Sequence, residues 1–391
     1  MGITMKITHI PDNNRIVFLT GTRADYGKLK SLIHIVNDCD QFEVHIFATG
    51  MHMLSKYGST FKEIIKDGFP NIYTFVNQNS NTPMDITLSN TITGFSNYIA
   101  ELSPIAIVVH GDRLEALAGA IVGAFNNIRV LHIEGGEVSG TIDESIRHAI
   151  TKFSHYHFVA NEMAKKRIMQ LGEPEENIFI FGSPDIDIMH STKLPSIKAV
   201  KDYYNILYEH YNIVLYHPVT TETSTLAQRV HAFVNALIQS CLNYVVIYPN
   251  NDLGSNLILR EYERLSDNSH FRIFPSMRFE YFLTLLRNAD SIIGNSSSGI
   301  REAGIYGIPA LDLGSRQSGR YQPDYFTHIH HCNETDSNIL DILQQTTATK
   351  SILTPQSYFG DGNSDKLFLD ILLHKNLWAQ DIQKKFIDID F

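Results

Sequence analysis

Two carboxylates follow apolar runs and a third precedes a helical stretch, positions that suit acid–base chemistry. Asp112 comes after Ile105–Val109, and Glu134 comes after Val130–Ile133 and before two glycines. Asp143 stands further along, just before a stretch with helical spacing. Carboxylates that share a site push their pKa values apart, so one can act as acid and another as base at the same pH. The alternative interpretation is that one of Asp143 and Glu144 only caps the helix that follows.

A serine-rich turn in the second half of the chain suits a phosphate group. Ser296 and Ser297 lie in the segment GNSSSG, between a predicted strand and a predicted helix. Hydroxyl groups and backbone N–H groups at a helix start bind anions. Glu302 then either accepts hydrogen bonds from two ribose hydroxyls or closes a capping box with the serines. His217, at the end of the run Tyr211–Tyr216, either reaches the phosphates or is structural.

A second turn that could bind an anion lies near the N-terminus, in the segment GTRADYG that begins at Gly21. Its glycine permits a tight turn, and we expect free N–H groups at the following helix start. Arg23 would add a charge-assisted bond to a phosphate. The other interpretation is an ordinary turn and cap. Arg113, beside Asp112, is either a surface charge or a group that faces a ligand.

The elements that position these residues alternate between strands and helices. Short apolar runs followed by amphipathic stretches indicate parallel sheets with helices on both faces. The pattern pauses at Leu194–Tyr203, a polar stretch that we interpret as a linker, and then repeats. The sequence therefore predicts two doubly wound, Rossmann-like α/β domains with an interdomain cleft. We expect domains at residues 1–193 and 204–365, with a helical segment at 366–391 that packs back on the first domain.

Composition excludes several classes of protein. The 391 residues include 42 acidic and 32 basic side chains, a net charge of −10, which argues against a broad nucleic-acid or anionic-membrane surface. No apolar run is long enough to span a membrane, and no signal peptide is predicted. Cys39, Cys241 and Cys332 follow no disulfide or metal pattern, so a reducing cytoplasm fits best. The histidines show no HExxH spacing, and we predict no metal site.

An ordered set of motifs resembles the UDP-N-acetylglucosamine 2-epimerases, and most closely their hydrolysing branch in sialic acid biosynthesis. The motifs are GTRADYGKL from Gly21, HGDRLEALA from His110, HIEGGEVSGTIDESIRHAI from His132 and GNSSSGIREAG from Gly294. They extend over most of the chain. The non-hydrolysing branch has a proline after the first arginine, where this chain has Ala24.

The resemblance implies a fold like that of GT-B glycosyltransferases, with UDP held by the second domain and the sugar facing the first. It implies no cofactor, and it suggests a homodimer or homotetramer. Carried over residue by residue, it makes the first-domain carboxylates and His217 catalytic and gives the other polar residues to UDP and sugar binding. The catalytic set is Asp112, Glu134, Asp143 and His217; the binding set is Arg23, Arg113, Ser296, Ser297 and Glu302.

The implied reaction converts UDP-N-acetylglucosamine and water to UDP and N-acetylmannosamine. The C2 hydrogen of a pyranoside is barely acidic, so its removal must be coupled to loss of UDP. The family route is anti elimination to a 2-acetamidoglucal followed by syn addition of water. Two alternatives remain open: a hydrolysing 2-epimerase for UDP-2,4-diacetamido-2,4,6-trideoxyglucose in the legionaminic acid pathway, and a GT-B glycosyltransferase. A non-catalytic UDP-sugar sensor is disfavoured by the three carboxylates.

Overall fold

The computed structural model describes residues 10–11, 13–79, 82–138, 142–219, 222–249, 254–321 and 323–388. The chain forms two compact units. Unit 1 comprises the chain up to Ile188 together with the chain from Tyr358 onward, and unit 2 comprises Met189–Ser357. The divisions therefore differ from the predicted 1–193, 204–365 and 366–391, since the segment that rejoins unit 1 begins at Tyr358.

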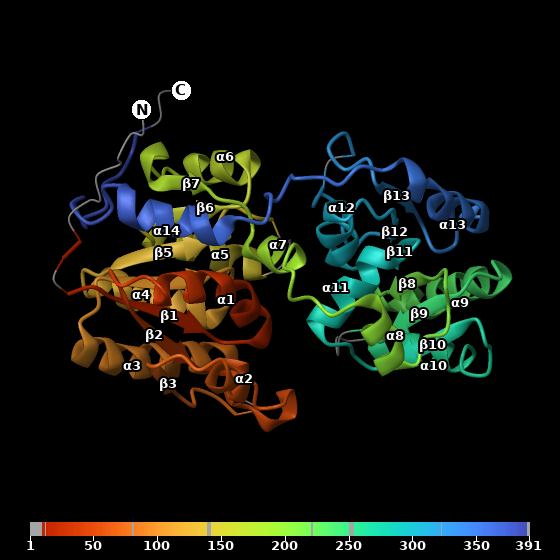
Figure 1. Cartoon of the computed structure of the whole chain (residues 1–391), viewed down its shortest axis with the longest axis horizontal. Coiled ribbons are helices and arrows are strands. Elements are labelled where there is room, and N and C mark those ends of the chain that lie inside the picture. The colour runs from red at the N-terminus through yellow and green to blue at the C-terminus, as the bar shows by residue number, and fades with distance from the viewer. Residues whose placement is uncertain are drawn as a thin grey trace. The chain divides into compact units, whose positions relative to one another are not determined.

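Unit 1 is built on a seven-stranded parallel sheet with the order β3-β2-β1-β4-β5-β6-β7 (Figure 1). Its strands are β1 (Arg15–Thr20), β2 (Glu43–Ala48), β3 (Ile72–Thr74), β4 (Ala106–His110), β5 (Arg129–Ile133), β6 (Tyr156–Val159) and β7 (Ile178–Ile180). Its α-helices are α1 (Arg23–Asn37), α2 (Phe61–Lys66), α3 (Met84–Leu102), α4 (Leu114–Phe125), α5 (Ile142–Phe153), α6 (Glu162–Gln170), α7 (Pro184–Met189, whose last residue falls in unit 2) and α14 (Ser364–His374).

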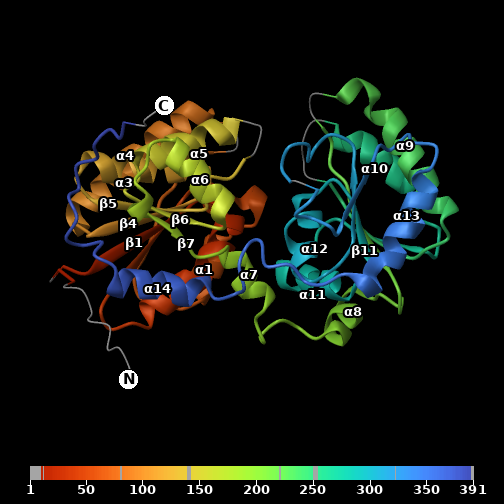
Figure 2. The same cartoon turned by 90° about the horizontal axis from the view of Figure 1, so that it is seen from above.

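Both faces of this sheet are covered, which explains why its central strands are apolar throughout. In β4 the alternate residues Ala106 and Val108 pack under α1 and α14, whereas Ile107 and Val109 pack under α3, α4 and α5. Figure 2 shows these two helical layers on opposite sides of the sheet. Phe368 of α14 contacts Phe158 with a ring centroid distance of 4.8 Å, so the last helix is part of the core of unit 1.

Unit 2 repeats the arrangement with six parallel strands in the order β10-β9-β8-β11-β12-β13. Its strands are β8 (Asn212–Leu215), β9 (Tyr244–Ile247), β10 (Phe271–Phe274), β11 (Ser291–Gly294), β12 (Ala310–Leu313) and β13 (Ile329–Cys332). Its α-helices are α8 (Ile197–Tyr204), α9 (Thr223–Gln239), α10 (Ser255–Glu263), α11 (Phe279–Asn288), α12 (Glu302–Ile305) and α13 (Ile339–Ala348). The predicted fold class, two doubly wound α/β halves, is confirmed.

Three local predictions are wrong. The predicted linker Leu194–Tyr203 contains α8, because Ser196 caps the Ala199 N–H and Val200 is buried. The helix predicted to follow the serine-rich turn is interrupted, since a 3-10 turn η4 (Ser297–Gly299) precedes α12. The C-terminal segment is helical only to His374, after which Lys375 has extended backbone angles.

In each sheet the strand order changes direction once, between β1 and β4 in unit 1 and between β8 and β11 in unit 2. Open parallel sheets bind ligands beyond the carboxyl ends of the strands at such a switch point. The candidate residues of both units follow the carboxyl ends of these strands or of their neighbours.

Candidate active site

Glu134 directly follows β5 and has an unusual backbone conformation. Its φ angle is +60°, a left-handed conformation that a non-glycine residue seldom adopts, and its N–H donates to the Phe158 carbonyl at 2.9 Å. The following glycines allow close packing: a Cβ atom on Gly136 would lie 2.4 Å from the Ala164 carbonyl oxygen of α6. The HIEGG segment therefore holds Glu134 in a strained turn that points its side chain inward, which is typical of functional sites.

The Glu134 carboxylate is only 4% exposed and is surrounded by polar groups from distant parts of the chain. Lys28 Nζ of α1 lies 2.9 Å from one carboxylate oxygen and 3.2 Å from the other. Ser183, after β7, donates its hydroxyl to Oε1. His110 Nε2 lies 3.2 Å from Oε2, at ion-pair distance but without hydrogen-bond alignment. A buried carboxylate needs such compensation, and the Lys28 ammonium supplies the opposite charge.

Arg147 of α5 joins two segments that carry predicted carboxylates. Its Nη1 donates to the Glu134 carbonyl oxygen at 2.5 Å, and its Nη2 donates to the Asp112 carboxylate. Asp143 lies four residues before Arg147, on the same face of α5. Asp143 and Glu144 both lie in the first turn of α5, where the helix dipole also favours a carboxylate, so the capping alternative stays open. The structure thus brings Asp112 and Glu134 to one guanidinium group, with Asp143 one turn away.

The loop that carries Asp112 is held by a buried histidine. Gly111 has φ +71° and donates its N–H to the Ile133 carbonyl at 2.9 Å. The Gly111 carbonyl in turn lies 2.9 Å from His132 Nε2. Burial holds the pKa of His132 well below its usual range, so the ring is neutral and Nε2–H is the donor. These bonds connect the carboxyl ends of β4 and β5 and fix Asp112 relative to Glu134.

The N-terminal turn uses three of its own N–H groups internally. Asp25 accepts from the Gly21 N–H at 2.9 Å and from the Thr22 N–H at 3.0 Å, and Thr22 Oγ1 accepts from the Asp25 N–H at 3.2 Å. This capping box satisfies these three amides, and its carboxylate would repel an anion. Arg23 is half-exposed and forms an ion pair with Glu63 at 3.1 Å.

Unit 1 contains a cavity of about 300 Å³ beside the predicted site residues. Arg113 and Asp143 line it together with Glu115 of the first turn of α4. Pockets for small molecules start at about this size. Two of the predicted site residues therefore face a space that can hold part of a ligand.

In unit 2, Asn295 fixes the backbone of His217 with both ends of its amide. Asn295 Oδ1 accepts from the His217 N–H at 2.7 Å, and Asn295 Nδ2 donates to the His217 carbonyl at 2.9 Å. Arg316 Nη1 and Gln317 Nε2 donate to the Asn295 carbonyl at 3.0 and 2.7 Å. Burial, and then the positive charge of Arg316, lowers the pKa of His217 to about 3, so the imidazole is neutral at physiological pH.

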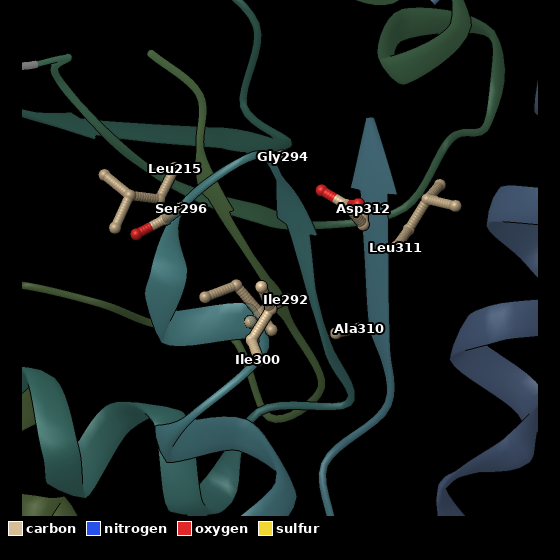
Figure 3. A pocket seen from close by; sticks show the side chains of 9 residues that line it. Leu215, Ile292, Gly294, Ser296, Ile300, Ala310, Leu311 and Asp312 are labelled. Atoms are coloured by element: carbon tan, nitrogen blue, oxygen red, sulfur yellow. The ribbon is translucent and has the colours of Figure 1, made fainter. Parts of the chain in front are cut away.

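The serine turn follows β11 at the same switch point. Ser296 accepts from the Ser298 N–H at 3.3 Å, Ser297 is exposed, and Glu302 begins α12. Gly294 is required here, because a Cβ atom would lie 2.1 Å from the Leu215 carbonyl oxygen. A void of about 10 Å³ beneath the turn is lined by Ser296, Asp312 and aliphatic side chains (Figure 3). It has room for one water molecule, so a ligand would bind on the turn and not under it.

Several residues of these two clusters were not predicted from the sequence. Lys28 and Ser183 contact Glu134 from segments far apart in the chain, and Asp185 Oδ2 lies 3.7 Å from Lys28 Nζ. Asn295 was within a motif, but no role was assigned to it. Arg147 could have been found, because its spacing of four residues from Asp143 places both on one helix face.

Among the residues that the structure describes, no group of histidine, cysteine, aspartate and glutamate side chains is arranged to hold a metal ion. Within the same part of the chain, no helix combines the length and apolar character needed to cross a membrane.

Comparison with known proteins decides the family. The model of the UDP-N-acetylglucosamine 2-epimerase family matches residues 35–373. The chain belongs to this family. It is 45% identical to a UDP-N-acetylglucosamine 2-epimerase of Neisseria meningitidis serogroup B over 96% of this chain and 99% of that protein. It is 32% identical to a Legionella pneumophila UDP-N,N'-diacetylbacillosamine 2-epimerase (hydrolyzing) over 95% of this chain and 98% of that protein.

Solved structures of the epimerase family have the same fold. A crystal structure of a UDP-GlcNAc 2-epimerase from Neisseria meningitidis bound to UDP-GlcNAc matches with a TM-score of 0.76 at 16% identity. The match covers 92% of this chain and 99% of that chain. At this identity the match supports the two-unit epimerase fold, while the family assignment comes from the sequence matches.

Proposed function

We propose that the chain is a hydrolysing UDP-N-acetylglucosamine 2-epimerase that converts UDP-N-acetylglucosamine and water to UDP and N-acetylmannosamine for sialic acid biosynthesis. The observation that carries the proposal is the arrangement around Arg147, which holds Asp112 through its side chain and Glu134 through its carbonyl. The 45% identity to the Neisseria epimerase supports this choice of sugar nucleotide.

The carboxylates of unit 1 supply the acid–base chemistry. One carboxylate removes the C2 proton while the C1–O bond to UDP breaks, which leaves a C1=C2 double bond. Water then adds syn across this double bond, with its hydroxyl group going to C1 and a proton to C2 on the same face. The proton reaches C2 from the face opposite to the one it left, which inverts C2. Each positioned proton transfer is worth about 10²–10⁴-fold in rate. Glu134 suits the first step, because Lys28 compensates its charge and Ser183 orients it.

Unit 2 binds the nucleotide in this proposal. Ser296 and Ser297 present hydroxyl groups at the end of β11, and Glu302 at the start of α12 accepts hydrogen bonds from the ribose. His217 is neutral and held by Asn295, so its imidazole N–H can donate to the diphosphate as negative charge grows on the leaving group. Arg23 and Arg113 of unit 1 are proposed to contribute to substrate binding.

The decisive experiment is NMR of the purified protein with UDP-N-acetylglucosamine in heavy water. We expect UDP and free N-acetylmannosamine to appear together, with deuterium at C2 of the product. Release of UDP with protium retained at C2 would indicate simple hydrolysis and would contradict the elimination route. Sugar transfer that requires an added acceptor would instead identify a glycosyltransferase.

A second substrate is favoured by the 32% identity to the Legionella enzyme, whose name specifies a diacetamido sugar. Turnover of UDP-2,4-diacetamido-2,4,6-trideoxyglucose is therefore measured in parallel. A higher kcat/KM for this sugar nucleotide than for UDP-N-acetylglucosamine would identify the chain as an enzyme of the legionaminic acid pathway.

A further inference from the structure

Glu115 is a buried carboxyl group that the mechanism above does not use. It stands in the first turn of α4 and is 2% exposed. Its side chain fills the space that two glycines leave free. A Cβ atom on Gly21 would lie 2.7 Å from Glu115 Cδ, and one on Gly50 would lie 2.4 Å from Glu115 Oε1. Glu115 therefore sits against the carboxyl ends of β1 and β2, beside the switch point of the unit 1 sheet.

This carboxyl group is incompletely satisfied by the described part of the protein. Glu115 Oε2 is buried and has no hydrogen-bond partner there, and Arg113 Nε is 3.9 Å from it. Burial raises the pKa of Glu115, which favours the neutral carboxylic acid. Leaving such a group without a partner costs free energy, and unsatisfied buried polar groups are few in native proteins. A ligand that supplies the missing partner would recover this cost.

The position of Glu115 also selects the charge of that ligand. Doubly wound sheets often bind a phosphate at the switch point, but here Asp25 already accepts the Gly21 and Thr22 amides. Two carboxyl side chains thus occupy the region where an anion would otherwise bind. An uncharged ligand with hydroxyl or amide groups is the chemical class that fits.

The cavity beside Glu115 has a lining that matches this class. Its volume is about 300 Å³, the small end of ligand pockets and adequate for a monosaccharide. Gln78 and Thr87 line it with an amide and a hydroxyl, and Met51 and Leu54 line it with apolar surface. An acetamido sugar combines hydroxyl groups, an amide and a methyl group, and so complements both kinds of lining.

We propose that this cavity binds the N-acetylated sugar of the substrate and that Glu115 forms a hydrogen bond with one of its hydroxyl groups. Glu115 is then a specificity-determining residue, next to Asp143 on the cavity wall. The inference rests on the proposed function and adds to it the place of the sugar and the group that recognises it.

The test compares wild type, Glu115→Gln and Glu115→Met with UDP-N-acetylglucosamine and its 3-deoxy, 4-deoxy and 6-deoxy analogues. We expect wild-type kcat/KM to fall at least about tenfold for one analogue, the size of one lost hydrogen bond. Glu115→Met should lose a similar factor with the parent sugar and should no longer distinguish it from that analogue. Glu101→Gln, an exposed glutamate at the end of α3, is the matched control and should behave as wild type.

The outcomes separate the two proposals. If wild type converts all four sugars equally, or if both Glu115 variants lose the same factor with every sugar, the carboxyl group is structural and the inference is wrong. The wild-type series decides this even where a variant does not fold, and UDP binding checks the folding of each variant. If wild type releases no UDP from the parent sugar, it is the proposed function that fails.

Discussion

Unit 1 and unit 2 share a strand order but carry opposite chemistry at equivalent positions. In unit 1 the strand ends hold a buried carboxylate, an ammonium group and a guanidinium group, namely Glu134, Lys28 and Arg147. In unit 2 the neutral amide of Asn295 holds the backbone of His217, whose imidazole is also neutral. The sheet therefore determines where a ligand binds, while the residues after each strand determine whether that place exchanges protons or holds a phosphate.

The largest effect on turnover is expected from removing the negative charge of Glu134 in unit 1. Glu134→Gln keeps the shape of the side chain but removes the proton acceptor, so kcat should fall by about 10³-fold or more. The affinity for UDP, measured by calorimetry, should stay within threefold, because the nucleotide is assigned to unit 2.

The control for this variant is Glu162→Gln, which changes an exposed glutamate in the first turn of α6. It should leave both quantities unchanged. Wild-type turnover by Glu134→Gln would show that Glu134 is not catalytic. A loss of UDP affinity in the same variant would contradict the assignment of nucleotide binding to unit 2.

A change in unit 2 is expected to weaken UDP binding more than it lowers kcat. Asn295→Ala leaves the His217 N–H and carbonyl without their partners, so the diphosphate contacts lose their alignment. UDP should bind about 10- to 100-fold more weakly, while kcat at saturating substrate falls less than tenfold. Isothermal titration and steady-state kinetics measure the two effects.

Asn288→Ala, at the exposed end of α11, is the control and should bind UDP like wild type. Unchanged UDP affinity in Asn295→Ala would show that the amide pair does not organise the nucleotide site.

The smallest effect concerns the stability of unit 1 and its dependence on pH. Asp187 accepts from the Ser364 N–H at 2.9 Å and from the Asp365 N–H at 3.0 Å, at the start of α14. Burial raises its pKa from 3.8 to about 6. Between these two pH values the folded state holds a proton on Asp187 that the unfolded state has released. Protonation of Asp187 therefore stabilises the fold fully below pH 3.8, and this stabilisation is lost as the pH rises through 6.

Comparison with Asp187→Asn isolates this contribution, since the amide does not titrate. Between pH 4 and 6.5 the free energy of unfolding of wild type should fall by roughly 2 kcal/mol relative to the variant. The single tryptophan, Trp378, is buried in unit 1, so its fluorescence during urea unfolding reports this unit. A difference that stays constant with pH would contradict the raised pKa.

The central strands could be predicted because both of their faces are buried and their residues are almost all apolar. β4 and β5 are such cases, as are β9 and β11 in unit 2. The edge strands β3, β7 and β13 were missed, and so was the buried inner strand β6. β3 and β7 are only three residues long, and histidines interrupt the apolar pattern of β6 (Tyr-His-Phe-Val) and β13 (Ile-His-His-Cys).

The candidate site was predictable only where its residues are close in the sequence. Asp112 and Glu134 follow recognisable strands, so their common edge could be inferred. The pairing of Lys28 with Glu134 spans 106 residues and depends on how α1 packs on the sheet. The bond between Asn295 and His217 similarly depends on the register in which Gly294 pairs with Leu215. No local pattern encodes either contact.

The return of the chain to unit 1 has a consequence for biosynthesis. Phe368 and Trp378 belong to the same hydrophobic core as Phe18 and Ile46, yet all of unit 2 is translated between them. Unit 2 is one continuous stretch and can complete its core while the ribosome is still adding residues. The core of unit 1 cannot be completed until α14 has been synthesised, so the apolar surface that α14 covers stays exposed while unit 2 is translated. A chaperone would be needed most during this interval.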